Sequence, residues 1–342
     1  MKVVVFHEHG GPEVLKYQDA PEPEVGPGEV LVRVRACGIN HLDIWTRMGI
    51  RGVPISMPHI LGNDIAGEVA EVGPGVTNVR VGEGIVVAPG LSCGQCEYCL
   101  DGWDSLCPEY KIIGFQVDGG YAEYAKAPAV NAIPVSQALS FEEWAATPLV
   151  FLTSWHMLVT RAGLKPGETV LIQAAGSGVG SAAIQIAKYH NAFVITTAGS
   201  DEKVAKAKEL GADEVINYRA RDFVAEVKGI TNGRGVDVVF EHIGGETFER
   251  SLQCLAKRGR LVTCGATTSP SATIDIRFLY SRQQSIIGSL MGGKKEQRDV
   301  IKLLEKGKLR PVVDEVFPLQ EAVSAHRKME ERRQFGKLVL RC

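Results

Sequence analysis

The sequence predicts an α/β protein with two domains: an irregular, barrel-like β domain and a doubly wound parallel sheet of six strands. Short apolar runs broken by Gly and Pro fill the first 150 residues, whereas strands alternate with helices over residues 151–290. The length of 342 residues also suits two domains of roughly 100–200 residues each. Residues 291–342 lack a core of their own, so we expect them to pack back on residues 1–150 and complete the first domain.

The β character of the first domain is clearest in residues 29–36. Val30, Val32 and Val34 recur there at every second position, which is the period of a strand. Further short apolar runs, each followed by turn-forming residues, indicate more strands of the same kind.

The second domain repeats a strand and a helix. Its predicted strands are residues 169–175, 193–199, 214–218, 236–243, 260–266 and 285–290. Helical segments separate most of them, and this alternation is typical of a parallel sheet that binds a dinucleotide.

Composition excludes several classes of function. Thirty-eight Lys and Arg residues face 40 Asp and Glu, a formal net charge of −2, so we expect neither a nucleic acid nor an anionic membrane as partner. The longest apolar stretch, Trp144–Val159, is interrupted by Pro148 and is too short to span a bilayer. The apolar run at the N-terminus meets His7 almost at once, unlike a signal peptide, so we expect a cytoplasmic protein.

Four of the eight cysteines share one short loop, the cysteine lobe (residues 90–110): Cys93, Cys96, Cys99 and Cys107. Four thiolates at this spacing suit a closed tetrahedral zinc site, which leaves no ligand position for a substrate. We therefore expect one structural zinc ion per chain, with an iron–sulfur cluster as the rival assignment.

A glycine loop, Ala174–Gly180, follows the first predicted strand of the second domain and opens a helix. Small residues there let the backbone approach a pyrophosphate, whose charge the helix N-terminus stabilises. The strict GxGxxG pattern is absent because Ser181 stands at its last position. The alternative is a glycine-rich turn that serves packing alone.

The end of the second strand of this domain favours NADPH over NADH. An NAD site has an acidic residue about 20 residues after the glycine loop, but here the strand ends in Ala198-Gly199-Ser200. Ser200, Lys203 and Tyr218 are expected to bind the 2′-phosphate, although Ser200 could simply cap a helix. The full set predicted to bind the cofactor is Thr153, Gly176, Ser177, Gly178, Val179, Gly180, Ser200, Lys203, Tyr218 and Gly265.

The order of these features resembles the medium-chain dehydrogenase/reductase superfamily, with a GroES-like domain followed by a Rossmann domain. The resemblance covers essentially the whole chain. Its markers are GPGEVLVRVRACGIN, GNDIAGEVAEVGPGV, the cysteine lobe, AAGSGVG and the closing GKLVL.

The chain departs from the zinc alcohol dehydrogenases of that superfamily at each ligand of their catalytic zinc. Asn40 stands at the position of the first Cys, Asn63 at that of the His, and Leu149 at that of the last Cys. Leu42 replaces the hydroxyl of the proton relay. The resemblance thus implies that the catalytic zinc is absent.

Without that Lewis acid, the reaction expected is hydride transfer to an acceptor that is already electrophilic. The Asn40-x-x-Asp43 segment resembles the zinc-independent quinone and enoyl reductases, so we expect an NADPH-dependent reductase of quinones or α,β-unsaturated carbonyls or thioesters. The residues expected around the acceptor are Asn40, His41, Asp43, Trp45, Asn63 and Asp64. Alternatively Asn40 and His41 bond only the backbone of a glycine-rich turn, and Trp45 belongs to the core.

Two other functions remain open from the sequence: an alcohol dehydrogenase with NAD(P), and a non-catalytic NADPH-binding protein. The partners expected are a small electrophilic substrate and a second copy of the chain. Residues 285–290 would be an edge strand, which favours a homodimer or tetramer.

Overall fold

The computed structural model describes all 342 residues, which form two compact units. The first unit comprises Met1–Leu152 and Gly292–Cys342, and the second comprises Thr153–Met291. Every helix falls short of the length and apolar character that crossing a membrane requires.

The first unit is built around a seven-stranded sheet. Its strands follow the order β10-β6-β5-β3-β18-β17, and β9 also pairs with β3. This path ends at β10 and β17, so the sheet is open, which is consistent with the predicted irregular, barrel-like β domain. The strands of the unit are β1 (Lys2–Phe6), β2 (Lys16–Asp19), β3 (Glu29–Gly38), β4 (His59–Ile60), β5 (Asp64–Val72), β6 (Gly84–Val87), β7 (Gly90–Leu91), β8 (Lys111–Ile112), β9 (Tyr124–Pro128), β10 (Ala132–Pro134), β17 (Val313–Pro318) and β18 (Lys337–Arg341).

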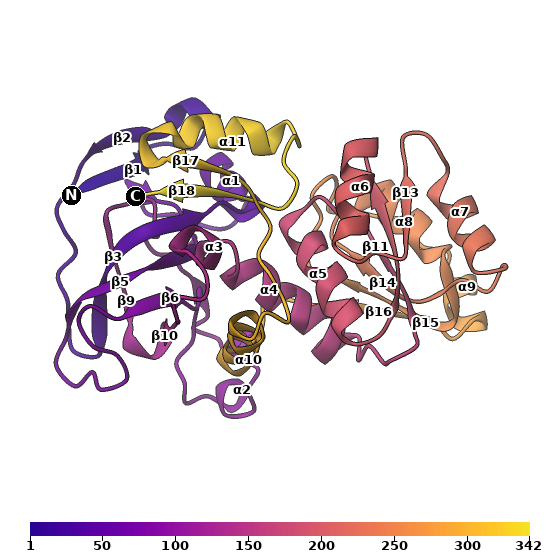
Figure 1. Ribbon diagram of the computed structural model, residues 1–342, viewed down its shortest axis with the longest axis horizontal. Coiled ribbons are helices and arrows are strands. Elements are labelled where there is room, and N and C mark those ends of the chain that lie inside the picture. Colours follow the sequence, from indigo (N-terminus) through magenta and orange to yellow (C-terminus); the bar gives the residue numbers. More distant parts are fainter. The chain divides into compact units, whose positions relative to one another are not determined.

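Strand β3 is the centre of this sheet. Val30, Val32 and Val34 are buried in the core while Arg33 is exposed, as the alternating pattern predicts. Strand β18 runs antiparallel to β3, with Val339 opposite Gly38, and β17 lies on its other side. Figure 1 shows β17 and β18, in yellow, beside the indigo β3. The end of the chain therefore completes the sheet that the first residues begin.

The helices of the first unit are α1 (His41–Met48), α2 (Glu97–Leu100), α3 (Phe141–Ala145), α10 (Lys294–Glu305) and α11 (Ala322–Glu330), while α4 (Pro148–Trp155) leads into the second unit. Helix α1 was not predicted from the sequence, whose alternative interpretation set Asn40 and His41 in a glycine-rich turn. Asn40 is the N-cap of α1, and the Asp43 carboxylate accepts the Asn40 N–H at 2.7 Å. The Asn40-x-x-Asp43 spacing thus serves as a helix-start signal.

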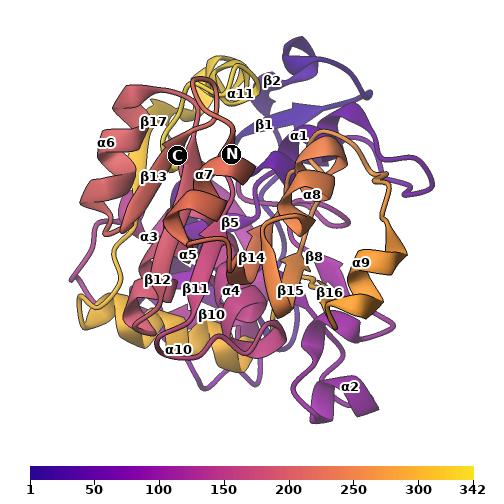
Figure 2. The same ribbon diagram turned by 90° about the vertical axis from the view of Figure 1, so that its right-hand side faces the viewer.

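The second unit is a six-stranded parallel sheet in the order β13-β12-β11-β14-β15-β16, seen from left to right in Figure 2. The six predicted strands are all present: β11 (Thr169–Ile172), β12 (Phe193–Ala198), β13 (Glu214–Asn217), β14 (Val236–Glu241), β15 (Leu255–Thr263) and β16 (Ser285–Gly288). Buried strand runs such as Val170–Ile172 need both faces covered, and the crossover helices cover them.

The helices of the second unit are α5 (Gly178–Tyr189), α6 (Asp201–Glu209), α7 (Phe223–Ile230), α8 (Gly245–Leu252) and α9 (Ile276–Ser281), and a π-helix spans His156–Arg161. The strand order reverses between β11 and β14, so the carboxyl ends of these strands meet at the switch point where such sheets bind ligands.

Candidate active site

The cysteine lobe gathers its four sulfur atoms within 4.8 Å of one another. Cys99 Sγ lies 3.9 Å from Cys93 Sγ and 3.5 Å from Cys96 Sγ. Zn–S bonds of about 2.3 Å in a tetrahedron separate sulfur atoms by about 3.8 Å, so the residues fit a zinc ion. Backbone N–H groups of Gln95 and Cys96 lower the pKa of Cys93 to about 7, which favours the thiolate that zinc binds.

Helix α10 anchors this lobe. The Lys294 N–H donates to Asp104 Oδ2 at 2.8 Å, and its ammonium contacts Asp104 Oδ1 at 3.4 Å and Ser92 Oγ. Four thiolates around Zn²⁺ would carry a net negative charge, which a neighbouring ammonium offsets. The lobe is thus tied to the segment of the first unit that follows Met291.

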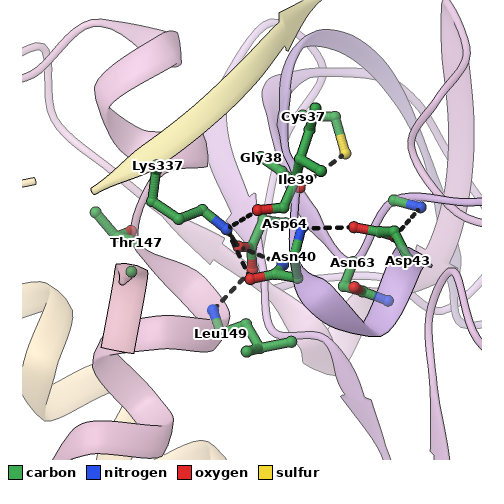
Figure 3. A network of polar contacts seen from close by, with 12 residues as sticks. Cys37, Gly38, Ile39, Asn40, Asp43, Asn63, Asp64, Thr147, Leu149 and Lys337 are labelled. Atoms are coloured by element: carbon green, nitrogen blue, oxygen red, sulfur yellow. Dashed lines mark hydrogen bonds and ion pairs between the residues drawn. The ribbon is translucent and has the colours of Figure 1, made fainter. Parts of the chain in front are cut away.

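A buried network of polar groups lies at the N-terminus of α1 (Figure 3). The Lys337 ammonium contacts Asp64 Oδ2 at 2.8 Å, Asn40 Oδ1 at 2.7 Å and the Ile39 carbonyl at 2.7 Å. Asn40 Nδ2 donates to Asp64 Oδ2 at 2.9 Å, and the Leu149 N–H donates to Asp64 Oδ1 at 2.7 Å. Both oxygens of Asp64 and all three hydrogens of the ammonium therefore have partners within the first unit.

Asp43 fixes the backbone around this network. Its carboxylate accepts the Asn40 N–H at 2.7 Å and the Gly62 N–H at 3.0 Å, so one side chain joins the segments before α1 and β5. Burial raises the pKa of Asp43 to about 7, against the opposing effects of the Asn40 N–H and Lys337.

The remaining residues expected near the acceptor occupy two places. His41 and Trp45 lie on α1 with ring centroids 5.9 Å apart, and burial, with Arg332 second, lowers the pKa of His41. Asn63 is fully buried: its Nδ2 donates to the Ile113 carbonyl at 2.6 Å, while its Oδ1 has no hydrogen-bond partner. The Asn63 amide oxygen, next to Asp64 in the sequence, is therefore a buried hydrogen-bond acceptor without a donor.

In the second unit, the glycine loop joins β11 to α5. Ala174 adopts a left-handed φ of 56°, and Ser177 Oγ accepts the Gly180 N–H at 2.9 Å and so caps α5. A Cβ on Gly180 would lie 2.2 Å from the Ala174 carbonyl oxygen, so this position requires glycine. The helix N-terminus faces the carboxyl edge of the sheet, the place where a pyrophosphate binds. Gly176, Gly178 and Val179 complete the loop.

Other residues expected to bind the cofactor follow neighbouring strands at the same edge. Ser200 follows β12 and caps α6, accepting the Lys203 N–H at 3.3 Å. Tyr218 follows β13, and its hydroxyl lies 2.7 Å from where a Cβ on Gly199 would stand. Gly265 follows β15, and its carbonyl accepts the Thr263 hydroxyl at 3.2 Å. These residues are set out along the edge where a nucleotide would lie.

Thr153, unlike these residues, is buried on α4, where its hydroxyl donates to Met291 Sδ at 3.9 Å. Its neighbour Ser154 donates to the Val179 carbonyl at 2.9 Å, so α4 supports the glycine loop. Sequence reasoning missed His242, which follows β14 with Nε2 3.3 Å from Ser177 Oγ. A histidine near the carboxyl end of the predicted strand 236–243, beside the switch point, was the available signal.

Comparisons with known proteins agree on the family architecture. Residues 26–137 match the model of the alcohol dehydrogenase GroES-like domain, and residues 178–306 match that of the zinc-binding dehydrogenases. An NAD-dependent alcohol dehydrogenase of Sulfolobus acidocaldarius is 35% identical over 100% of this chain and 99% of its own length. A quinone oxidoreductase of Rattus norvegicus is 30% identical over 99% of this chain and 97% of its own.

Two solved structures are similar over the full chain. The crystal structure of an NAD-dependent alcohol dehydrogenase has a TM-score of 0.97 and 48% identity, covering 100% of both chains. A 2-octenoyl-CoA carboxylase reductase in complex with NADP and 2-octenoyl-CoA has a TM-score of 0.92 and 30% identity, covering 100% of this chain and 87% of its own.

Proposed function

The chain belongs to the medium-chain dehydrogenase/reductase superfamily, and from this premise we propose that it is an NADPH-dependent reductase that works without a catalytic zinc ion. Membership makes it an oxidoreductase that uses a nicotinamide cofactor. The acceptors we propose are quinones and α,β-unsaturated carbonyls or thioesters. One structural zinc ion per chain would occupy the cysteine lobe.

The observation that carries the proposal is the set of hydrogen bonds at Asp64. Its Oδ2 accepts from Asn40 and Lys337 and its Oδ1 accepts from Leu149, so three of the carboxylate's roughly four lone pairs are already engaged within the protein. Catalytic zinc sites use thiolate, imidazole and carboxylate ligands, but Asn40 and Asn63 offer only neutral amides. The Lys337 ammonium supplies the positive charge that a metal would otherwise bring to Asp64.

Besides the hydride, the proposed reaction requires only that the protein polarise the acceptor and supply it with one proton. NADPH held at the glycine loop, Ala174–Gly180, would supply the hydride, and the acceptor would also require the proton. Asn40 Nδ2 has a second hydrogen beyond the one given to Asp64, and we assign it to the oxygen on which negative charge develops. His41, neutral at pH 7 because burial lowers its pKa, relays a proton from water. Trp45 forms a wall of the acceptor pocket, and Asp43 holds the segment in place.

The preference for NADPH rests on the end of β12. Ala198-Gly199-Ser200 carries no acid that would repel a 2′-phosphate, and the Ser200 and Tyr218 hydroxyls are donors beside it. Lys203 adds a positive charge on the first turn of α6. The relative crystallised with NADP and an enoyl thioester supports both the cofactor and the acceptor class.

Alcohol dehydrogenase activity is the second candidate, because the solved structure at 48% identity bears the name NAD-dependent alcohol dehydrogenase. Elemental analysis of metal-replete protein distinguishes the two, together with initial rates on a quinone, an enone and primary and secondary alcohols. We expect about one zinc per chain and turnover of the quinone or enone with NADPH. Two zinc ions per chain with alcohol oxidation would overturn the proposal, and tight NADPH binding without any turnover would indicate a binding protein.

A further inference from the structure

A buried chain of polar side chains adjoins the start of the glycine loop in the second unit. It consists of Thr197 on β12, Gln173 directly after β11 and Ser251 on α8. The Thr197 hydroxyl donates to Gln173 Oε1 at 2.7 Å, and Gln173 Nε2 donates to Ser251 Oγ at 2.9 Å. Strands β11 and β12 are neighbours in the parallel sheet (Figure 2). Polar side chains that water does not reach must be satisfied by such contacts, so this chain fixes the direction of each of its members.

The Thr197 hydroxyl is also a partner of the loop backbone. Its oxygen accepts the Ala174 N–H at 3.0 Å. A hydroxyl carries one hydrogen, and because that hydrogen goes to Gln173 Oε1, a lone pair is directed at the Ala174 amide. The Ala175 N–H donates to the Thr197 carbonyl at 2.9 Å. One residue of β12 thus holds the first two amides of the loop.

Ala174 is the residue whose conformation this arrangement holds. Its φ of 56° lies in the left-handed region, which an alanine enters only at a steric cost from its Cβ. Such a conformation persists where the surrounding contacts over-determine it. The Ala174 carbonyl accepts the Ser177 hydroxyl at 2.9 Å and the Ser177 N–H at 3.0 Å. Ala174 is therefore held by β12 at its N–H and by the loop itself at its carbonyl.

We infer that Thr197 is a positioning residue for the cofactor: its hydroxyl, oriented by Gln173, holds Ala174 in the left-handed conformation that starts the glycine loop. That conformation brings the Ala174 carbonyl to Ser177, the N-cap of α5. The loop amides are then in place before a pyrophosphate binds, and a preorganised site spares its ligand the cost of ordering it. The inference rests on the proposed function in taking the glycine loop as the pyrophosphate site.

The test is Thr197→Val, which replaces the hydroxyl by a methyl group of similar size and leaves the Ala174 N–H without its partner. We expect the Kd for NADPH, measured on the full chain by quenching of tryptophan fluorescence, to rise about tenfold. Thr197→Ser keeps the hydroxyl and should bind NADPH as the unmodified protein does. An unchanged Kd in Thr197→Val, or an equal loss in Thr197→Ser, would overturn the inference.

Thr196→Val is the matched control. Thr196 precedes Thr197 on β12 and is also buried, but its hydroxyl donates to the Ile172 carbonyl at 2.7 Å and not to the loop. Its loss should lower thermal stability, as Thr197→Val does, while leaving the Kd for NADPH unchanged. A similar rise of the Kd in both variants would show that the effect is not specific to Thr197 and would refute its role.

A fragment of the cofactor tests whether the effect arises at the pyrophosphate. Adenosine 2′-phosphate has the phosphate proposed to bind at Ser200 but no pyrophosphate, so its Kd should be the same in Thr197→Val and in the unmodified protein. Adding Ala174→Gly to Thr197→Val should recover much of the lost NADPH affinity, since glycine adopts a left-handed φ without steric cost. Equal weakening of both ligands, or no recovery with glycine, would contradict positioning through Ala174.

A readout without any ligand separates this inference from the proposed function. Hydrogen exchange of the free protein, followed by mass spectrometry, should be faster over residues 173–180 in Thr197→Val than in Thr196→Val or the unmodified protein. Unchanged exchange there would remove the inference even if NADPH reduced enones normally. Faster exchange in a protein that prefers NADH, or that reduces neither quinones nor enones, would overturn the proposed function and leave Thr197 in its role.

Discussion

Lys337 and Asp64 meet as an ion pair 2.8 Å long in which both side chains are buried. They come from the last strand of the first unit and from β5, and β3 lies between these strands. Two charges removed from water require mutual pairing and further hydrogen bonds to be tolerated. Here Asn40, Ile39 and Leu149 supply those bonds.

Breaking this ion pair should lower the stability of the fold. Lys337→Met leaves the Asp64 charge buried without a cation, so we expect the free energy of unfolding to fall by about 3–5 kcal/mol. Lys126→Met is the control, because its ion pair with Glu29 is partly exposed and its loss should lower the free energy of unfolding by under about 1 kcal/mol. Urea denaturation measures both. The double variant Lys337→Met with Asp64→Leu should recover much of the loss, and no recovery would argue against the pair as the cause.

The cysteine lobe should hold one zinc ion through all four thiolates. Cys107→Ser removes one ligand, so we expect zinc per chain to fall from about one towards zero and thermal stability to drop. Cys254→Ser is the control, since Cys254 is buried in the second unit away from the lobe. Elemental analysis and calorimetry provide the measurements. Retention of zinc by Cys107→Ser would show that the ion binds elsewhere.

Cofactor preference should respond to an acid at the end of β12. Ser200→Asp keeps a good helix cap but places a negative charge where the 2′-phosphate is proposed to bind. We expect the ratio of kcat/KM for NADPH to that for NADH to fall by about 100-fold, two steps of about 1.4 kcal/mol. Ser140→Asp, at the cap of α3, should leave the ratio unchanged. An unmodified protein that already prefers NADH would refute the argument.

Strand β16 should form an interface between copies of the chain. It is one of the two edges of the six-stranded sheet, and Ile276, Phe278 and Tyr280 on the nearby helix α9 are largely exposed. Ile287→Lys places a charge on that edge, and light scattering should find a smaller assembly than for the unmodified protein. Val81→Lys, also at an exposed apolar residue, is the control. A mass equal to one chain before any substitution would exclude the interface.

The features that the sequence predicted well are those with local signals. The six strands of the second unit are visible in the sequence as apolar runs, and the cysteine spacing identifies the lobe without any tertiary information. Helix α1 was not predicted, and Asn40 and His41 were alternatively set in a glycine-rich turn, although Asn40-x-x-Asp43 is itself a capping pattern.

The partners of the candidate site could not be predicted in the same way. Lys337 stands in a short terminal strand, where a lysine ordinarily points to solvent, and only the pairing of β18 with β3 brings it to Asp64. The buried side chains of Arg47 and His326 contact each other at 3.2 Å and likewise come from positions 279 residues apart along the chain. Nothing in either local segment marks a buried polar residue, because burial here is a property of the assembled sheet.

Placing β18 between β3 and β17 also dictates an order of assembly during synthesis. When residues up to Leu152 have left the ribosome, one side of β3 still lacks β18 and Asp64 still lacks its cation. Both arrive only after the whole second unit, Thr153–Met291, has been translated. The second unit is continuous in sequence and can fold as soon as it has been translated. During that time the first unit still lacks β18 and β17, so one edge of β3 stays unpaired. The buried network around Asp64 is therefore among the last parts of the first unit to form.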